Sequence, residues 1–138
     1  LEEGHVLPAL IHRVYRAKMD NQPLVVWGSG SPLREFIFSD DIAELALWAL
    51  DKYNERSPLI MSSGIETSIG DVVRLIADIV NFKNEIIFDS KKPDGQYRKP
   101  SDVSRLQNLN PDFKWKSLRD GLKETVNWFE ATYPNVRM

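Results

Sequence analysis

Apolar residues recur every three or four positions in several stretches of the chain. This spacing predicts amphipathic helices over residues 6–18, 42–53, 69–80 and 118–129. The first of them carries Pro8 in its first turn, where a missing N–H costs nothing. Helices therefore account for most of the predicted apolar surface.

Side chains that can cap a helix stand at the start of the last three of these segments. In two cases a serine is followed three residues later by an aspartate, as in a capping box, and in the other case a pair of aspartates precedes the apolar stripe. A shorter helix is predicted over residues 102–109. The capping residues are Asp40 and Asp41, Ser68 with Asp71, and Ser117 with Asp120.

Short apolar runs between the helices predict strands over residues 24–27, 35–39, 58–62 and 86–88. Helices and strands alternate without an internal repeat, which predicts a small mixed α/β fold. A chain of 138 residues has room for one hydrophobic core, so we treat residues 1–138 as one domain.

The glycine-containing turn after the first predicted strand differs from that of a dinucleotide site. Gly28 and Gly30 are followed by Pro32 and Leu33, whereas the Rossmann fingerprint has a third glycine at the start of its helix. The sequence therefore does not encode a Rossmann domain.

The predicted helix over 42–53 is apolar on two sides. Its main stripe includes Leu45 and Leu50, but Leu47 and Trp48 fall outside it, because each residue turns a helix by about 100°. The chain also begins at Leu1 rather than Met. We therefore expect a piece of a longer protein, and expect another part of that protein to cover Leu47 and Trp48.

Composition narrows the classes of function. The formal net charge of −2 argues against general nucleic-acid binding. The chain has no cysteine, which excludes disulfides and thiolate metal sites and is compatible with the cytoplasm. No signal peptide is visible, and the longest nearly apolar run, 42–50, is far below the roughly 20 residues of a membrane helix. We expect a cytoplasmic protein without membrane association.

A long polar loop is predicted over residues 89–101, and loops of this length are often functional. Its segment 91–99 has four positive charges and one negative charge, a local charge of +3. Such a patch suits a bound phosphate, and Asp94 can accept hydrogen bonds from a sugar hydroxyl. A solvated basic loop without a ligand is the alternative.

Histidine and arginine supply further candidates on the first helix. His5 is the best acid–base candidate because imidazole titrates near neutrality, although a histidine at a helix start is more often a surface residue. His12 is expected on the solvated face. Arg13 and Arg16 share a helix face, and a guanidinium can bind phosphate oxygens. Solvated charge on a polar face is the alternative for both.

Trp27 and Arg34 flank the turn at Gly28 and Gly30. Together they would present an aromatic plane and a guanidinium on adjacent strands. Burial of Trp27 in the core is the alternative. No pattern of a metal site or of a Ser/His/Asp triad is visible.

Three strings of residues together match a known pattern. They are Gly4-His5-Val6-Leu7-Pro8-Ala9-Leu10; Val26-Trp27-Gly28-Ser29-Gly30 with Arg34-Glu35-Phe36 and Asp40-Asp41; and Phe88-Asp89 through Pro93-Asp94-Gly95 to Arg98-Lys99. In this order and spacing they resemble the GDP-L-fucose synthases, a family of extended short-chain dehydrogenase/reductases. The second string is widespread among nucleotide-sugar enzymes of this superfamily, whereas the first and third narrow the match. The resemblance covers essentially the whole chain and corresponds to the C-terminal, substrate-binding part of the family fold.

The resemblance implies roles for individual residues. His5 matches the family's histidine, which is expected to act as an acid and to lie near the nicotinamide of NADP. Arg13 matches a residue that contacts the diphosphate or sugar of the substrate. Trp27 and Arg34 match residues that line the GDP-sugar pocket, and Asp94 matches a further substrate contact. To these we add Lys92 and Lys99 on charge alone.

The family's reaction, by this resemblance, converts GDP-4-keto-6-deoxy-D-mannose to GDP-L-fucose through 3,5-epimerisation and NADPH-dependent reduction of the 4-keto group. In that fold an upstream Rossmann domain binds NADP, so the present residues alone are expected to be inactive. The full-length enzymes are expected to be homodimers held mostly by that domain, which leaves this part free to be a monomer.

Two alternatives remain open at this point. The chain could be the substrate domain of another nucleotide-sugar epimerase or dehydratase, which a preference for UDP or dTDP sugars would reveal. It could also be a non-catalytic binding module whose basic loop contacts an acidic partner, in which case binding would survive the loss of Trp27.

Overall fold

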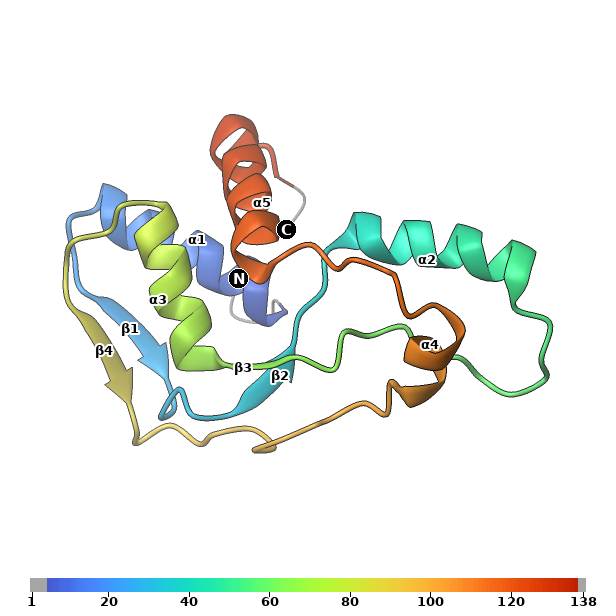
Figure 1. Ribbon diagram of the computed structural model, residues 1–138. Coiled ribbons are helices and arrows are strands. Elements are labelled where there is room, and N and C mark those ends of the chain that lie inside the picture. Colours follow the sequence, from blue (N-terminus) through green and yellow to red (C-terminus); the bar gives the residue numbers. More distant parts are fainter. Residues whose placement is uncertain (1–4, 137–138) are drawn as a thin grey trace.

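The computed structural model describes residues 5–136. Helices and short strands alternate along the chain, as the sequence pattern predicted, and they form a small mixed α/β fold (Figure 1). The elements are α1 (Val6–Met19), β1 (Leu24–Trp27), β2 (Leu33–Glu35), α2 (Ser39–Lys52), β3 (Glu66–Ser68), α3 (Ile69–Ile79), β4 (Ile86–Asp89), α4 (Ser104–Leu109) and α5 (Leu118–Thr132).

The strands form two separate pairs. β1 and β4 run parallel, with Leu24 opposite Ile86 and Trp27 opposite Asp89. β2 and β3 run antiparallel, with Leu33 opposite Ser68. Because β3 leads directly into α3, this second pair brings the start of α3 next to β2.

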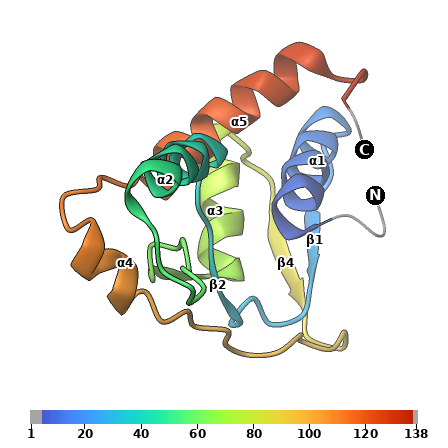
Figure 2. The ribbon, with the colours of Figure 1, turned by 90° about the vertical axis from the view of Figure 1, so that its right-hand side faces the viewer.

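The hydrophobic core lies where α1, α3 and α5 meet the inner face of β1 (Figure 2). Val14, Val72, Val73 and Ile76 are fully buried there. Val25 on the other face of β1 stays 47% exposed. The run over 24–27 is therefore buried on one face only.

Capping follows the sequence prediction at α3 and α5. The Ser68 hydroxyl accepts from the Asp71 N–H at 3.0 Å, and the Ser117 hydroxyl accepts from the Asp120 N–H at 3.1 Å. The prediction at α2 is wrong in detail. Phe38 is the N-cap and makes no side-chain cap bond, while Asp40 and Asp41 lie inside the first turn.

Two predicted strands are wrong. The strand expected over 35–39 is β2, Leu33–Glu35, and Ser39 already starts a helix. Residues 58–62 form no strand, and β3 lies later, at Glu66–Ser68. The polar β3 has no apolar pattern of its own, and its strand conformation depends on hydrogen bonds to β2.

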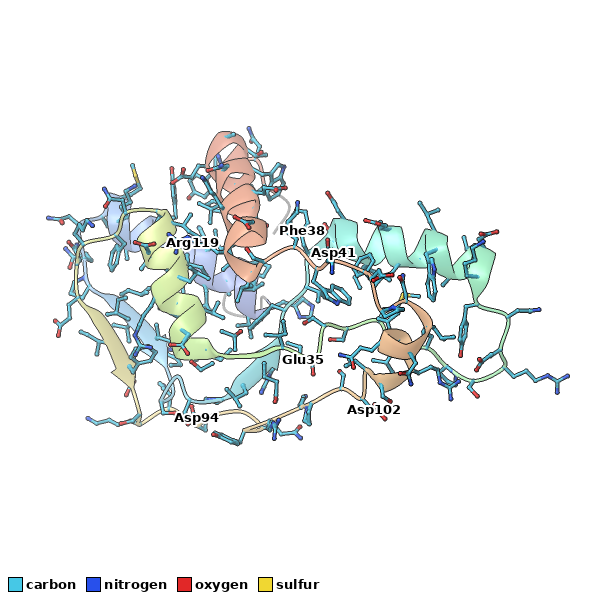
Figure 3. The ribbon with its side chains drawn as sticks, viewed as in Figure 1. Glu35, Phe38, Asp41, Asp94, Asp102 and Arg119 are labelled. Atoms are coloured by element: carbon cyan, nitrogen blue, oxygen red, sulfur yellow. The ribbon has the colours of Figure 1, made fainter. Side chains whose placement is uncertain are left out.

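Helix α2 projects away from the core (Figure 1). Asp41 holds its first turn, because the carboxylate accepts from the Lys116 N–H at 2.9 Å beside Phe38 (Figure 3). In the predicted main stripe, Leu45 is fully buried but Leu50 is 84% exposed, so the stripe is covered only near its beginning. Leu47, outside the stripe, is 69% exposed, and the cover expected over Leu47 and Trp48 stays a prediction.

Candidate functional site

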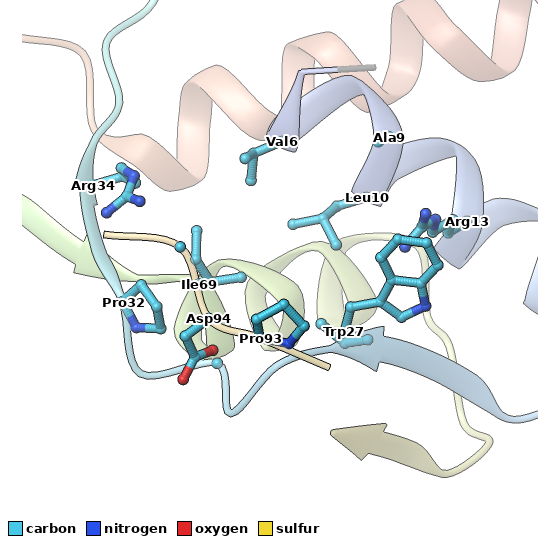
Figure 4. Close-up of a pocket in the computed structure, with 13 residues that line it drawn as sticks. Val6, Ala9, Leu10, Arg13, Trp27, Pro32, Arg34, Ile69, Pro93 and Asp94 are labelled. Atoms are coloured by element: carbon cyan, nitrogen blue, oxygen red, sulfur yellow. The ribbon is translucent and has the colours of Figure 1, made fainter. Parts of the chain in front are cut away.

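A cavity of about 310 Å³ opens at the carboxyl end of β1, the edge of a parallel strand pair where ligands commonly bind (Figure 4). Its walls come from α1, from the β1–β2 connection, from the start of α3 and from the 90–101 loop. The lining residues are Val6, Ala9, Leu10, Arg13, Val26, Trp27, Gly30, Pro32, Arg34, Ile69, Pro93, Asp94 and Gly95.

Trp27 is an exposed aromatic residue at the edge of this cavity, with 53% of its surface accessible. The guanidinium carbon of Arg13 lies 5.1 Å from the centre of its ring, and the Lys92 Nζ lies 5.3 Å from it. Both distances are typical of cation–π contacts. The alternative of a core tryptophan is therefore wrong, and two cations gather beside an accessible aromatic ring.

Arg34 places a second guanidinium at the cavity, on the side of β2. Its Nη1 donates to the Leu33 carbonyl oxygen at 2.5 Å. Its Nη2 lies close to Gly95, since a Cβ added to this glycine would be 3.5 Å from that nitrogen. The side chain is thus oriented by the backbone of β2 and lies against the 90–101 loop. Arg13 and Arg34 together make the cavity suitable for an anion.

Asp94 lines the cavity and its carboxylate already has partners, while its contact with a substrate stays a prediction. Oδ1 accepts from the Ser29 N–H at 2.8 Å, and Oδ2 accepts from the Ser29 hydroxyl at 2.7 Å. Ser29 follows Gly28, which lies at the end of β1 with φ of +83°. The 90–101 loop is therefore joined to the turn after β1.

Known proteins resemble the whole chain in sequence and in fold. Residues 1–64 match the NAD dependent epimerase/dehydratase family. Over 99% of its length the chain is 45% identical to a GDP-L-fucose synthase of Dictyostelium discoideum, of which it covers 43%. It matches a gdp-l-fucose synthetase of Naegleria fowleri with a TM-score of 0.96 and 40% identity, over 99% of this chain and 42% of that one.

The chain is a homologue of the GDP-L-fucose synthases. The resemblance seen in the sequence is thereby confirmed, as is the small mixed α/β fold, which matches the C-terminal part of such synthetase structures. The NADP-bound form of the Naegleria fowleri protein gives a TM-score of 0.93. The chain spans under half of the length of these relatives.

The 90–101 loop of this GDP-L-fucose synthase homologue is held along β2 and β3. The Leu33 N–H donates to the Tyr97 carbonyl at 2.8 Å, and Arg98 Nε donates to Glu66 at 2.6 Å. Arg98 is therefore engaged in an ion pair with Glu66, and phosphate binding by the basic loop stays a prediction. Lys99 is exposed and does not line the cavity.

Glu35 is a residue that the sequence did not single out. Its carboxylate accepts from the Ser101 N–H at 2.7 Å and from the Ser62 hydroxyl, and so holds the end of the loop against β2 (Figure 3). Partial burial raises the pKa of Glu35, but the hydrogen bonds from Ser62 and Ser101 outweigh it and leave the pKa below its usual value. No spacing in the sequence could indicate these partners.

Of the two histidines, only His12 contradicts its sequence expectation. His5 is the exposed N-cap of α1, next to the cavity-lining Val6, and its acid role stays a prediction. His12 is half-buried between Phe129 and Tyr133, at ring distances of 6.0 and 5.7 Å, so the expected solvated position is wrong. Burial lowers the pKa of His12, which favours the neutral ring.

Arg16 is exposed, pairs with Asp20 at 3.5 Å and does not line the cavity, which fits the solvated charge expected on this helix face. Residues 5–136 hold no group of acidic, histidine or cysteine side chains able to bind a metal ion. Within the same range, no helix has the length and apolar character needed to cross a membrane.

Proposed function

We propose that this chain forms the GDP-sugar-binding part of a GDP-L-fucose synthase. The observation that carries the proposal is the arrangement of Arg13, Trp27 and Arg34 around one cavity in a chain that is 45% identical to such an enzyme. Two guanidinium groups match a diphosphate, since each can form paired charge-assisted hydrogen bonds. The accessible ring of Trp27 offers a flat apolar surface to a ring of the ligand.

In the complete protein, the proposed reaction is 3,5-epimerisation of GDP-4-keto-6-deoxy-D-mannose followed by reduction of the 4-keto group. Protons next to a carbonyl are acidic because the enolate spreads its charge onto oxygen, so inversion needs a base on one face and an acid on the other. His5 is the proposed acid, because it stands at the start of α1 beside the cavity-lining Val6.

NADPH would supply the hydride for the reduction when it is bound. The described residues do not fit a dinucleotide site, because no strand in them leads through a glycine-rich turn into a helix. The NADP site is accordingly proposed for the rest of the protein, with His5 near the nicotinamide. A homodimer formed mostly by that part, and a cytoplasmic location, belong to the same proposal.

Calorimetric titration of the chain with GDP, UDP, dTDP and NADP at one salt concentration tests the proposal. We expect binding of GDP and no binding of NADP. A preference for UDP or dTDP would favour another nucleotide-sugar enzyme. No binding of any nucleotide, either by the chain or by the longer protein that contains it, would contradict the proposed function.

Substitution of Arg34 tests the role of the cavity. Arg34→Ala should weaken GDP binding by about tenfold or more, since a charge-assisted hydrogen bond of roughly 1.5–3 kcal/mol is lost. Arg16→Ala is the matched control, because Arg16 is an exposed arginine outside the cavity. Equal effects of the two substitutions would place the nucleotide elsewhere.

A further inference from the structure

Asp94 makes the only hydrogen bonds that tie the tip of the 90–101 loop, residues 93–96, to other described residues. The loop is held on one side by the Lys92 N–H, which donates to the Asp89 carbonyl at 3.1 Å, and on the other by the Tyr97 carbonyl. Between them, the carboxylate of Asp94 accepts twice from Ser29, 65 positions earlier in the chain. The position of the tip therefore depends on this one side chain.

The turn after β1 is shaped to accept the carboxylate. A Cβ on Gly28 would lie 2.3 Å from Asp94 Oδ1, which is too close for any side chain, and the φ of +83° at Gly28 also favours glycine. The Ser31 hydroxyl lies 2.6 Å from the Ser29 hydroxyl, which donates to Asp94. The Ser29 N–H and hydroxyl thus contact Asp94, and the Ser31 hydroxyl contacts Ser29.

The tip in turn forms the wall of the cavity that faces Arg34. Pro93 and Gly95 both line the cavity, and Gly95 lies against the guanidinium of Arg34 (Figure 4). An unpaired carboxylate at this wall would repel a diphosphate, because like charges are unfavourable at short range. Hydrogen bonding to Ser29 instead holds the carboxylate at the turn after β1.

We propose that Asp94 is a positioning residue: through Ser29 it fixes residues 93–95 against Arg34 and so sets the width of the nucleotide cavity. The proposal rests on the proposed function, since it concerns the same cavity. It also gives Ser29, which does not line the cavity, an indirect part in binding.

A double-mutant cycle between Ser29 and Asp94 tests the proposal by GDP titration of the chain. We expect Asp94→Ala to weaken binding about tenfold and Ser29→Ala about threefold, because the backbone N–H of Ser29 remains. The double variant should bind no more weakly than Asp94→Ala alone, since both changes break one contact. Ser90→Ala is the matched control, because Ser90 is an exposed serine of the same loop that does not line the cavity, and it should change binding by less than about twofold.

Unchanged GDP binding in Ser29→Ala, together with weaker binding in Asp94→Ala, would overturn the proposal and make Asp94 a direct ligand. Effects that multiply in the double variant would overturn it as well.

Amide hydrogen exchange of Ser29 without ligand separates this proposal from the proposed function. The Ser29 N–H is protected by Asp94 and should exchange at least about tenfold faster in Asp94→Ala. Faster exchange in Asp94→Ala, with no nucleotide bound by the chain or by the longer protein that contains it, would support the contact and contradict the proposed function. Unchanged exchange would overturn the proposed positioning contact, whatever the chain binds.

Discussion

Helices α2 and α3 have similar sequence patterns and very different surroundings. Both carry an apolar stripe, but Val72, Val73 and Ile76 of α3 are fully buried, whereas Leu50 of α2 is 84% exposed. Helix α3 packs against both α1 and α5, while α2 is held mainly at its first turn. A periodic stripe thus predicts that a segment is helical, but it does not predict which part of the protein covers the stripe.

The largest effect on stability is expected in α3, the buried helix of the two. Ile76→Ala in α3 should lower the free energy of unfolding by about 2–5 kcal/mol, because it removes buried methylene groups and leaves a cavity. Urea unfolding followed by circular dichroism measures the change. A loss below about 1 kcal/mol would show that the α3 interface is loosely packed.

A smaller effect is expected at the start of α3. Ser68→Ala removes the acceptor for the Asp71 N–H and should cost about 1 kcal/mol of unfolding free energy. Ser39→Ala at the start of α2 is the matched control, because Ser39 is not the N-cap there. Urea midpoints that fall equally in both variants would argue against the observed difference in capping.

The packing of α1 on α5 should depend on pH through His12. Burial lowers its pKa in the folded state, so below about pH 6.5 the unfolded chain binds more protons than the folded one. Stability is therefore complete above that pH and declines as the pH falls toward the folded-state pKa. Thermal unfolding between pH 5 and 8 checks this, and His12→Gln should flatten the profile.

The smallest effect is expected on α2. Leu50→Ala should change the unfolding free energy of the chain by less than about 0.5 kcal/mol, because the side chain is largely exposed. Urea unfolding compares it directly with Ile76→Ala. The two helices would have to be considered equally packed if Leu50→Ala cost as much as the substitution in α3.

The parts of the fold that local rules determine were predictable from sequence. The two serine caps, the bounds of β1 and the apolar stripes of α1, α3 and α5 follow from residue types at fixed spacings. Strands β2 and β3 were misplaced because their conformation comes from pairing with each other. Residues 58–62 have an apolar composition but pair with no strand among residues 5–136.

The candidate site, like the fold, could be predicted from sequence only in part. Sequence motifs located Arg13, Trp27, Arg34 and the 90–101 loop, all of which meet at the cavity. They could not indicate that Asp94 contacts Ser29, since hydrogen bonds across 65 positions leave no local pattern. Nor could they show that His12 is packed between aromatic rings from α5 and its C-terminal cap.

Because β1 and β4 form a sheet of only two strands, this sheet affects how the chain associates with other chains. Both strands have an outer edge that pairs with no other strand among residues 5–136, and β1 is the uncharged sequence Leu24-Val25-Val26-Trp27. Ile87 of β4 and Val25 of β1 are also partly exposed. Unpaired backbone groups beside apolar side chains favour edge-to-edge association, so at high concentration this strand pair is the expected starting point of aggregation.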